Sequence, residues 1–381
     1  MRTEDFTNDA SGRLVKSTLG VLTFVPNPLP PVLQFDASLV RLIANAERAL
    51  GGLNGVGQGL PNPKLLIVPF LRREAVLSSR IEGTVTDVGQ LYLFEADPTR
   101  DHPDDALEVR NYVTALDYGL EAIRNGSPIN LKLLRELHSL LLAGVRGQDK
   151  NPGVVRTRLV GIGGSNIPSA KYVAPCHTLL PELLNDLFAF LARDLESSIV
   201  VELALLHYQF EAIHPFNDGN GRIGRLLLTL RLAERQVLSQ PLLYLSAFFE
   251  KERQAYYDGL YRVSTRGDWT TWIEFVALGI AEEAHDAQLR AASLLALRDD
   301  YRRLVGSLVR SGTAIQLVDS LLVTPYVTIA QAAEIMGVKF STAKRTVDTF
   351  VQAGLLAEIT GQARNRLYCA QAVIDLVGKD F

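Results

Sequence analysis

One stretch of twelve residues, His214 to Arg225, constrains this chain more than any other. It reads His-Pro-Phe-Asn-Asp-Gly-Asn-Gly-Arg-Ile-Gly-Arg, so it gathers a titratable base, a carboxylate, three glycines, two asparagines and two arginines. Polar groups are costly in an ordinary core turn, because each one needs a partner when it is buried. The stretch therefore predicts an active site.

The residues on either side predict how this stretch is held. Apolar residues recur at roughly helical spacing before His214 and again from Ile223 onward. Pro215 and the glycines interrupt the pattern between them, so we expect a helix, a tight loop and a second helix. A capped corner with a surface histidine is the simpler alternative, and the polar residues that follow the histidine make it the weaker one.

The loop has the composition of a phosphate site. Gly219 and Gly221 allow the backbone to approach a ligand closely, and the free amides at the start of the second helix favour an anion. Arg222 and Arg225 lie three residues apart, on one face of that helix, where guanidinium groups can bind phosphate oxygens. Asp218 adds a hard oxygen ligand of the kind that holds Mg²⁺.

The stretch resembles the signature of the Fic family at every fixed position. The resemblance implies transfer of AMP from ATP to a hydroxyl of a target protein, or of the chain itself, with His214 as general base and Asp218 as the Mg²⁺ ligand. A different phosphate-linked group is an alternative cargo. The resemblance further implies that ATP is bound by Gly219, Asn220, Gly221, Arg222, Ile223, Gly224 and Arg225.

A second phrase, Ser78 to Gly83, ends a predicted helix with Glu82, and a carboxylate is disfavoured at a helix C-terminus unless a cation lies nearby. The phrase resembles the Ser/Thr-x-x-x-Glu-Gly/Asn inhibitory motif of Fic proteins through Ser78, Glu82 and Gly83. The resemblance implies that Glu82 pairs with Arg225 in the place of the γ-phosphate. It also leaves open that the same Glu82 assists removal of AMP. A solvated surface glutamate is the alternative.

Residues 153 to 175 change pattern, with β-branched runs on both sides of Gly163-Gly164-Ser165-Asn166. We expect a hairpin in an otherwise helical chain. In Fic proteins such a flap binds the target segment as an added strand, which implies target docking at Val160, Gly161, Ile162 and Gly163. Downstream, residues 241–257 resemble the segment that walls the nucleobase. Glu252 stands near a position where many relatives carry asparagine, so its predicted contact with ATP departs from the family.

The N-terminal third predicts an extended, proline-rich arm over residues 24–33, a helix that ends near Ala49, and a loop over residues 51–63. The next predicted helix has Pro69 in its first turn. Helical patterns follow over 106–125 and 130–143, and a long one over 269–309. The predicted fold is mainly α: a Fic-type helical bundle with a β-hairpin flap. Its domains are an N-terminal helical region (1–100), a catalytic domain (101–310) and a winged-helix-like domain (311–381).

The last domain reads as three short helices, over 314–323, 328–336 and 341–353, followed by a strand, a turn and a strand, which resembles a winged helix-turn-helix. Lys344 and Arg345 would enter a DNA groove, and Arg364 and Arg366 would lie on the wing. Residues 314 to 381 hold six Lys and Arg against six Asp and Glu, however, so the electrostatic footprint is weak. DNA binding through residues 314–370 and protein binding stay equal alternatives. A nucleotide-sensing transcriptional regulator is the alternative function.

The composition gives few further limits. The chain has 381 residues, of which 47% are hydrophobic and 21% charged, and its net charge of −3 predicts no general attraction to nucleic acid or to anionic membranes. Its two cysteines do not suggest a disulfide framework. No leader-like or membrane-spanning pattern stands out, so we expect a cytoplasmic location. Whether the chain forms a homodimer is left open.

Overall fold

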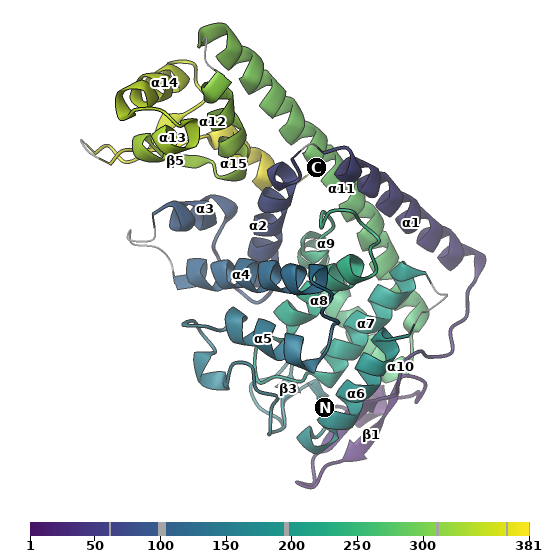
Figure 1. The fold of residues 1–381 in the computed structure, drawn as a ribbon. Coiled ribbons are helices and arrows are strands. Elements are labelled where there is room, and N and C mark those ends of the chain that lie inside the picture. Colours follow the sequence, from purple (N-terminus) through teal and green to yellow (C-terminus); the bar gives the residue numbers. More distant parts are fainter. Residues whose placement is uncertain (61, 98–103, 194–197, 310–311, 363–364, 381) are drawn as a thin grey trace.

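The computed structural model describes all residues except 61, 98–103, 194–197, 310–311, 363–364 and 381. Helices make up most of it, and three small antiparallel sheets lie at its edges (Figure 1). The α-helices are α1 Ala37–Gln58, α2 Lys64–Ile81, α3 Val88–Ala96, α4 Asp104–Arg124, α5 Leu131–Leu141, α6 Leu180–Leu191, α7 Ile199–Ile213, α8 Asn220–Glu234, α9 Ser246–Lys251, α10 Arg253–Arg266, α11 Trp269–Leu308, α12 Gly312–Val323, α13 Ile329–Met336, α14 Phe340–Gln352 and α15 Gln371–Gly378. The strands are β1 Gly12–Lys16, β2 Leu22–Pro26, β3 Gly161–Ile162, β4 Tyr172–Val173, β5 Tyr326–Thr328, β6 Ala357–Glu358 and β7 Leu367–Cys369, and short 3₁₀ turns are η1 Thr3–Asp5, η2 Gln148–Lys150 and η3 His177–Leu179.

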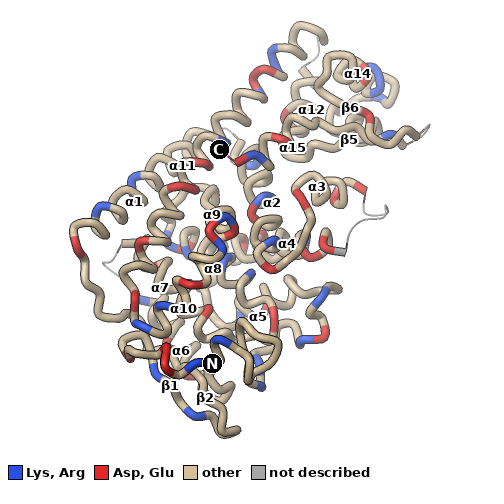
Figure 2. The backbone as a smooth tube through the Cα atoms, turned by 180° about the vertical axis from the view of Figure 1, so that it is seen from behind, with Lys and Arg blue, Asp and Glu red and all other residues tan. Residues whose placement is uncertain are grey.

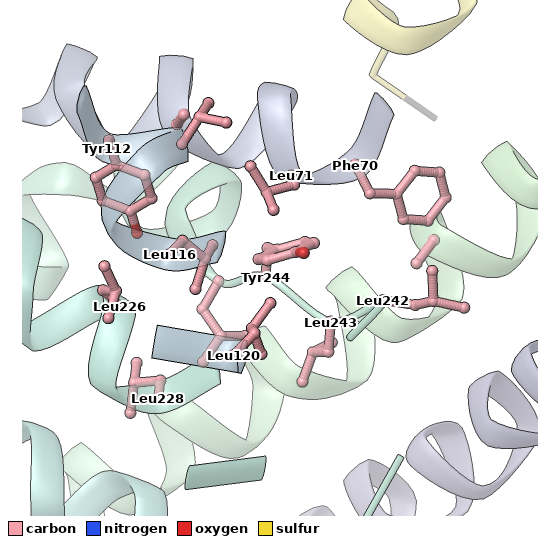
Figure 3. Packing of buried hydrophobic residues seen from close by; sticks show 14 of the residues in the cluster. Phe70, Leu71, Tyr112, Leu116, Leu120, Leu226, Leu228, Leu242, Leu243 and Tyr244 are labelled. Atoms are coloured by element: carbon pink, nitrogen blue, oxygen red, sulfur yellow. The ribbon is translucent and has the colours of Figure 1, made fainter. Parts of the chain in front are cut away.

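The core lies around α7, which is apolar on almost every side and is buried along most of its length. Such a helix is stable only when other helices surround it. Figure 3 shows how α2 supplies Phe70 and Leu71, α4 supplies Tyr112 and Leu116, and α8 supplies Leu226 to one continuous apolar cluster. The helices on either side of the candidate site, α7 and α8, are therefore held in the hydrophobic core.

Helix α1 corrects one prediction. It runs to Gln58, whereas the glycines after Ala49 predicted a loop. Glycine weakens an isolated helix by about 1 kcal/mol relative to alanine, but here it allows close packing. A Cβ atom at Gly52 would lie 3.1 Å from the Gln288 side chain of α11, and one at Gly57 would lie 2.9 Å from Ser239 Oγ. Tertiary contact along α11 therefore overrides local propensity.

Helix α2 begins at Lys64, so the prediction that Pro69 lies in the first turn is wrong, and the proline lies inside the helix. Its C-terminus agrees better with the sequence. The last helical residue is Ile81, Glu82 is the C-cap, and Gly83 follows with a φ of +98°. That angle is one that glycine adopts readily and other residues rarely do, which explains why the helix ends here.

The predicted flap is a hairpin, but its strands are much shorter than the sequence pattern. Gly161 pairs with Val173 and Ile162 with Tyr172, and the segment before them forms no ladder. The reason is the side chain of Arg156, which turns inward and binds carbonyls instead of facing a neighbouring strand. The expected strand from Val154 onward is thus a loop until Gly161.

An N-terminal hairpin was not predicted. Strands β1 and β2 pair antiparallel from Gly12 opposite Pro26 to Lys16 opposite Leu22, where only an extended arm was expected from Phe24 onward. The Phe24 ring is buried and lies 5.8 Å, centroid to centroid, from the ring of Tyr172 in the flap. The hairpin therefore supports the flap from behind.

The C-terminal unit has the order α12, β5, α13, α14, β6, β7, with β7 at the centre of the sheet. This order is compatible with a winged helix-turn-helix, which stays a prediction; β5 and α15 were not predicted. Lys344 is ion-paired with Asp348 at 2.6 Å, and Arg364 lies outside the described residues. The predicted boundaries near 98–103 and 310–311 also lie there, so the division into domains stays a prediction.

Charge is mixed over the backbone, with lysine, arginine, aspartate and glutamate interspersed along most helices (Figure 2). Within the described residues, no helix combines the length and the apolarity needed to cross a membrane.

Candidate active site

The loop begins where α7 ends, at His214. This residue has a left-handed backbone, with φ of +50°, and its N–H donates to Phe210 O at 3.0 Å. Histidine rarely adopts this conformation. Pro215 prevents the helix from continuing, because the residue before a proline is disfavoured in the α region. The side chain is 16% exposed. The turn thus brings a histidine out of a buried helix to the edge of the loop.

Asn220 closes the loop. Its Oδ1 accepts a hydrogen bond from Phe216 N–H and its Nδ2 donates to Phe216 O, both at 2.9 Å. The side chain is buried, and both of its polar groups are bound to the backbone of one residue, Phe216. The sequence predicted a phosphate contact for Asn220; in this arrangement the side chain positions the loop.

The start of α8 is shaped to receive an anion. Gly219 is the N-cap with φ of +74° and makes no side-chain cap, so the first amides of the helix have no partner within it. Gly221 lies beneath the carboxylate of Glu82, since a Cβ atom there would be 2.4 Å from Glu82 Oε1. A carboxylate from another helix thus lies against this helix N-terminus, where the helix dipole favours negative charge.

Arg225 receives the same carboxylate. Its Nη2 donates to Glu82 Oε1 at 2.8 Å and to Ser78 O at 2.9 Å, and its Nε donates to Ser78 Oγ at 2.9 Å. The predicted contact of Glu82 with Arg225 is therefore present, and Ser78 joins it. Burial acts to raise the pKa of Glu82, but Arg225 outweighs it and holds that pKa below its ordinary value. Glu82 is thus an anion at neutral pH.

Arg222 has a partner that the sequence did not reveal. Its Nη1 donates to Glu108 Oε2 at 3.2 Å, and its Nη2 lies 3.9 Å from Asp218 Oδ1. Burial raises the pKa of Glu108, although Arg222 and Arg146 oppose the shift. Arg222 is buried between the two carboxylates, so its guanidinium is fixed at the base of the loop.

Two predicted ATP-binding positions in α8 have other surroundings. Ile223 is fully buried, and its side chain belongs to the apolar core. Gly224 lies against Glu211, because a Cβ atom there would be 2.3 Å from Glu211 Oε1. Glu252 is exposed at the junction of α9 and α10. The predicted contacts of these three residues with ATP stay untested.

The surroundings of His214 keep its imidazole neutral. Burial first, and then the nearby charge of Arg156, lower its pKa to about 4, so it is neutral at pH 7. Its Nδ1 lies 3.3 Å from Glu211 O and 3.9 Å from Glu211 Oε2. Those acceptors favour the tautomer with hydrogen on Nδ1, which leaves the Nε2 lone pair free to take a proton. Burial also raises the pKa of Glu211 to about 8, with Arg225 opposing the shift.

Arg156 connects the flap to the loop that begins at His214, and no sequence pattern indicated this role. Its Nε donates to His214 O at 2.7 Å, while Nη2 donates to Pro175 O at 2.7 Å and Nη1 to Arg158 O at 2.8 Å. Its own N–H donates to Pro215 O at 2.9 Å. Burial lowers its pKa to about 10, so it stays charged at neutral pH. One buried guanidinium thus ties both legs of the flap to the backbone of His214.

His138 of α5 makes the second connection. Its Nδ1 accepts from Gly153 N–H at 2.8 Å, so its Nε2 carries the proton and donates to Asp218 O at 2.9 Å. Its ring stacks on Phe216 with centroids 3.9 Å apart. Burial lowers its pKa to about 4. The one signal in the sequence was its place on the apolar face of the predicted helix, four residues after Leu134.

Replacing Arg156 with methionine is expected to lower the free energy of unfolding by about 3 kcal/mol or more, because each buried carbonyl left without a donor costs about 1–3 kcal/mol. Denaturant unfolding followed by circular dichroism measures this change. Arg158→Met is the matched control, since Arg158 is exposed and donates one side-chain hydrogen bond, to Asn217 Oδ1 at 3.1 Å. Equal stability of the two variants would contradict the role of Arg156.

Family comparisons agree with this geometry. Residues 40–121 match the model described as Fic/DOC family N-terminal, and residues 128–232 match the model described as Fic/DOC family. A probable protein adenylyltransferase of Aquifex aeolicus is 36% identical over 90 residues, which are 23% of this chain and 28% of that protein. The protein adenylyltransferase Fic of Aedes aegypti is 29% identical over 199 residues, which are 50% of this chain and 36% of that protein. The chain thus spans well under half the length of these relatives.

Solved structures share the fold. A Fic family protein from Desulfovibrio desulfuricans G20 matches with a TM-score of 0.57 at 20% identity, over 90% of this chain and 98% of that one. Fic-1 from Caenorhabditis elegans matches with a TM-score of 0.51 at 21% identity, over 67% of this chain and 74% of that one. These likenesses concern the fold alone, and they confirm the predicted mainly helical, Fic-type architecture.

Proposed function

This chain belongs to the Fic/DOC family, and from that premise we propose that it is a protein adenylyltransferase that moves AMP from ATP to a Ser, Thr or Tyr hydroxyl of a target protein and of itself. One observation carries the proposal. The carboxylate of Glu82 lies 2.8 Å from Arg225 and directly over Gly221, so the start of α8 accepts an anionic group next to a neutral histidine. A nucleotide phosphate has the same charge and suits the same donors.

The reaction follows from the position of His214. The target hydroxyl attacks the α-phosphorus, its proton passes to Nε2 of His214, and pyrophosphate leaves as the oxygen–phosphorus bond to AMP forms. General base catalysis of this kind needs a neutral imidazole, and the pKa of about 4 supplies it at neutral pH. Phosphoryl transfer depends mainly on positioning and on charge stabilisation, which the α8 amides and Arg222 would provide.

Mg²⁺ fits at Asp218. The side chain is 38% exposed, and its Oδ1 accepts the Gly219 N–H at 2.6 Å, which orients the carboxylate toward the start of α8. Within the described residues no three His, Cys, Asp or Glu side chains converge to hold a metal on their own. One carboxylate with substrate phosphates is the usual Mg²⁺ arrangement. Bound there, Mg²⁺ would neutralise charge on the α- and β-phosphates.

The same contact supports autoinhibition. Glu82 lies on Arg225, where the γ-phosphate would bind, so ATP would take an unproductive pose until Glu82 leaves.

The flap offers the docking site for the target, because β3 at Gly161 and Ile162 pairs with β4 on one side and has a free outer edge within the described residues. An extended segment can add to that edge through main-chain hydrogen bonds. The proposal includes a second role for Glu82, in which it assists the removal of AMP from the target.

Incubation with Mg²⁺ and ATP tests the transferase. Label carried on the α-phosphate should enter the chain, and label on the γ-phosphate should not, because pyrophosphate leaves. The Glu82→Gly variant makes the signal measurable, and its double variant with His214→Ala is the matched control. Transfer from the γ-position, or labelling that survives loss of His214, would overturn the proposal. Mass spectrometry of the labelled peptide identifies the added group and its residue.

Replacing Asp218 with asparagine is expected to raise the Mg²⁺ concentration for half-maximal labelling about tenfold or more, because the site loses the charge that attracts the metal. Labelling should recover partly at high Mg²⁺. A titration of Mg²⁺ in the Glu82→Gly background measures the shift, with Asp258→Asn as the control, since Asp258 is exposed and its Oδ1 accepts from Gln254 Nε2 of the same helix at 2.8 Å. An unchanged midpoint would exclude Asp218 as the ligand.

The alternative function, a transcriptional regulator, has less support. In the predicted recognition helix α14, Lys344 is paired with Asp348, and no observation on the described residues favours DNA. A regulator that only senses a nucleotide would also need no general base, whereas a neutral His214 with a free Nε2 can act as one.

A further inference from the structure

The last turn of α2 carries Ser78 and leads into Glu82, and its carbonyls need partners from beyond the helix because the chain turns away at Gly83. Two of these carbonyls have backbone donors. Ser79 O accepts from Glu82 N–H and Arg80 O accepts from Gly83 N–H, both at 3.0 Å. Such bonds between residues three apart are typical where a helix tightens at its end. The carbonyls on either side of this pair are bound by arginine side chains instead.

Ile81 O, the last carbonyl of α2, is bound by Arg253 at the start of α10. Arg253 Nη2 donates to it at 2.6 Å. The backbone amide that would continue the helical pattern to Ile81 O is that of Val85, and it donates to Asp105 Oδ2 at 2.8 Å instead. A guanidinium suits this place, because it meets both a carbonyl and the negative end of the helix dipole. Arg253 therefore completes the C-terminal cap of α2.

Arg253 differs from the other arginine at this turn. Arg225, which binds Ser78 O at 2.9 Å, is buried in the candidate site and is the group that a γ-phosphate would need. Arg253 is exposed and lies outside the His214–Arg225 loop. Its Cζ lies 6.0 Å from the centroid of the Tyr257 ring, at the outer limit of a cation–π contact. Arg253 can thus hold α2 without occupying the place of a phosphate.

The position of Ile81 O is tied to that of Glu82 by covalent geometry. The carbonyl of Ile81 and the Cα atom of Glu82 belong to one planar peptide unit, so a displacement of the Glu82 backbone also moves Ile81 O away from Arg253. The hydrogen bond from Arg253 is therefore made where the backbone lets the Glu82 carboxylate reach Arg225. An interaction that is made in one of two states and lost in the other favours the first state.

We propose that Arg253 is a positioning residue for the inhibition: by capping α2 it favours the state in which Glu82 occupies Arg225, and its loss lets the γ-phosphate of ATP compete better for Arg225. This inference rests on the proposed inhibitory function of Glu82, and it adds a residue that lies outside both sequence motifs. Charge-assisted hydrogen bonds are strong, but solvent screens an exposed guanidinium, so we expect an effect of about fivefold on the rate of labelling.

Labelling from ATP that carries its label on the α-phosphate tests the regulation. The quantity to compare is the effect of Arg253→Gln in the wild-type background divided by its effect in the Glu82→Gly background, because any loss of nucleotide binding is common to both and cancels. A ratio of about five is expected, and a smaller one for Arg253→Lys, which keeps a cation. Arg262→Gln is the matched control, since Arg262 is an exposed arginine of the same helix, paired with Asp268 at 2.9 Å. A ratio near one for Arg253→Gln would mean that Glu82 leaves by rotation of its side chain alone, and would overturn the proposal.

Hydrogen exchange tests the cap without AMP transfer. The amides of Glu82, Gly83 and Thr84 donate to carbonyls of the last turn, so they are protected while that turn is closed. In Arg253→Gln they should exchange about fivefold faster, and in Arg262→Gln they should exchange at the wild-type rate. Equal exchange in the two variants would overturn the cap, whereas faster exchange with a labelling ratio near one would overturn its link to inhibition. Absence of labelling in every variant would remove the transferase proposal and the regulation with it, and would leave the cap standing.

Discussion

Replacing Glu82 with glycine is expected to raise AMP labelling about a hundredfold. Breaking a buried, hydrogen-bonded ion pair costs about 3–5 kcal/mol, and each 1.4 kcal/mol is about tenfold in an equilibrium. The Glu82 side chain is 33% exposed while that of Arg225 is 2% exposed, so solvent screens the pair in part and the lower end of that range applies. The initial rate of label incorporation from ATP labelled on the α-phosphate measures the effect.

The same substitution should also lower the free energy of unfolding. Faster labelling by a less stable variant would then come from release of the site and not from a more stable fold. Arg225 stays buried and keeps its hydrogen bonds to Ser78, but it loses the carboxylate that pairs with it. We therefore expect a lower unfolding midpoint together with faster labelling. Glu47→Gly controls for glycine in a helix and should lower stability without raising the rate. A rate for Glu82→Gly equal to that of the wild type would remove Glu82 as the inhibitor.

Sequence patterns predicted the helices whose formation depends on residues close together in the sequence. The helices near 106–125 and 269–309, and the helix–loop–helix around the signature, follow from apolar spacing with Gly and Pro at the ends, and they are present as α4, α11, α7 and α8. The same reasoning failed at Gly52 and Gly57. There the energy that keeps α1 helical comes from contact with distant residues, which spacing along the sequence does not express.

The residues of the candidate site also fall into two groups: those that a local motif predicted and those that it did not. The signature named His214, and the phrase before Gly83 led to the pairing of Glu82 with Arg225. The residues that hold the loop in place could not be predicted, because each of them binds a residue that is distant in the sequence. Arg156 binds carbonyls at 213 and 214, and Glu108 binds Arg222 over 114 residues. A buried arginine that satisfies carbonyls has the same local sequence as an arginine on an exposed strand.

His214→Ala, made in the Glu82→Gly background, should reduce labelling about a hundredfold to ten-thousandfold, the usual contribution of a general base. The exposed His285→Ala is the matched control and should leave the rate unchanged. Thermal melts exclude unfolding as the cause. A loss below tenfold would mean that another group, or water, takes the proton from the target hydroxyl.

The pH dependence of the Glu82→Gly rate adds a sharper test of the same residue. A base works only when it is deprotonated, so the rate should fall as the pH drops through the pKa of His214. Burial and Arg156 lower that pKa to about 4, and the charge of Glu82 acts in the opposite direction. Removing Glu82 therefore lowers the pKa further. The rate limited by His214 should then stay level from pH 8 down to about pH 5, whereas an unperturbed histidine would lose half its activity near pH 6.5. An acid limb near 6.5 would mean that His214 is solvated in the working enzyme, and that the buried position next to Glu211 is not the one from which it takes the proton.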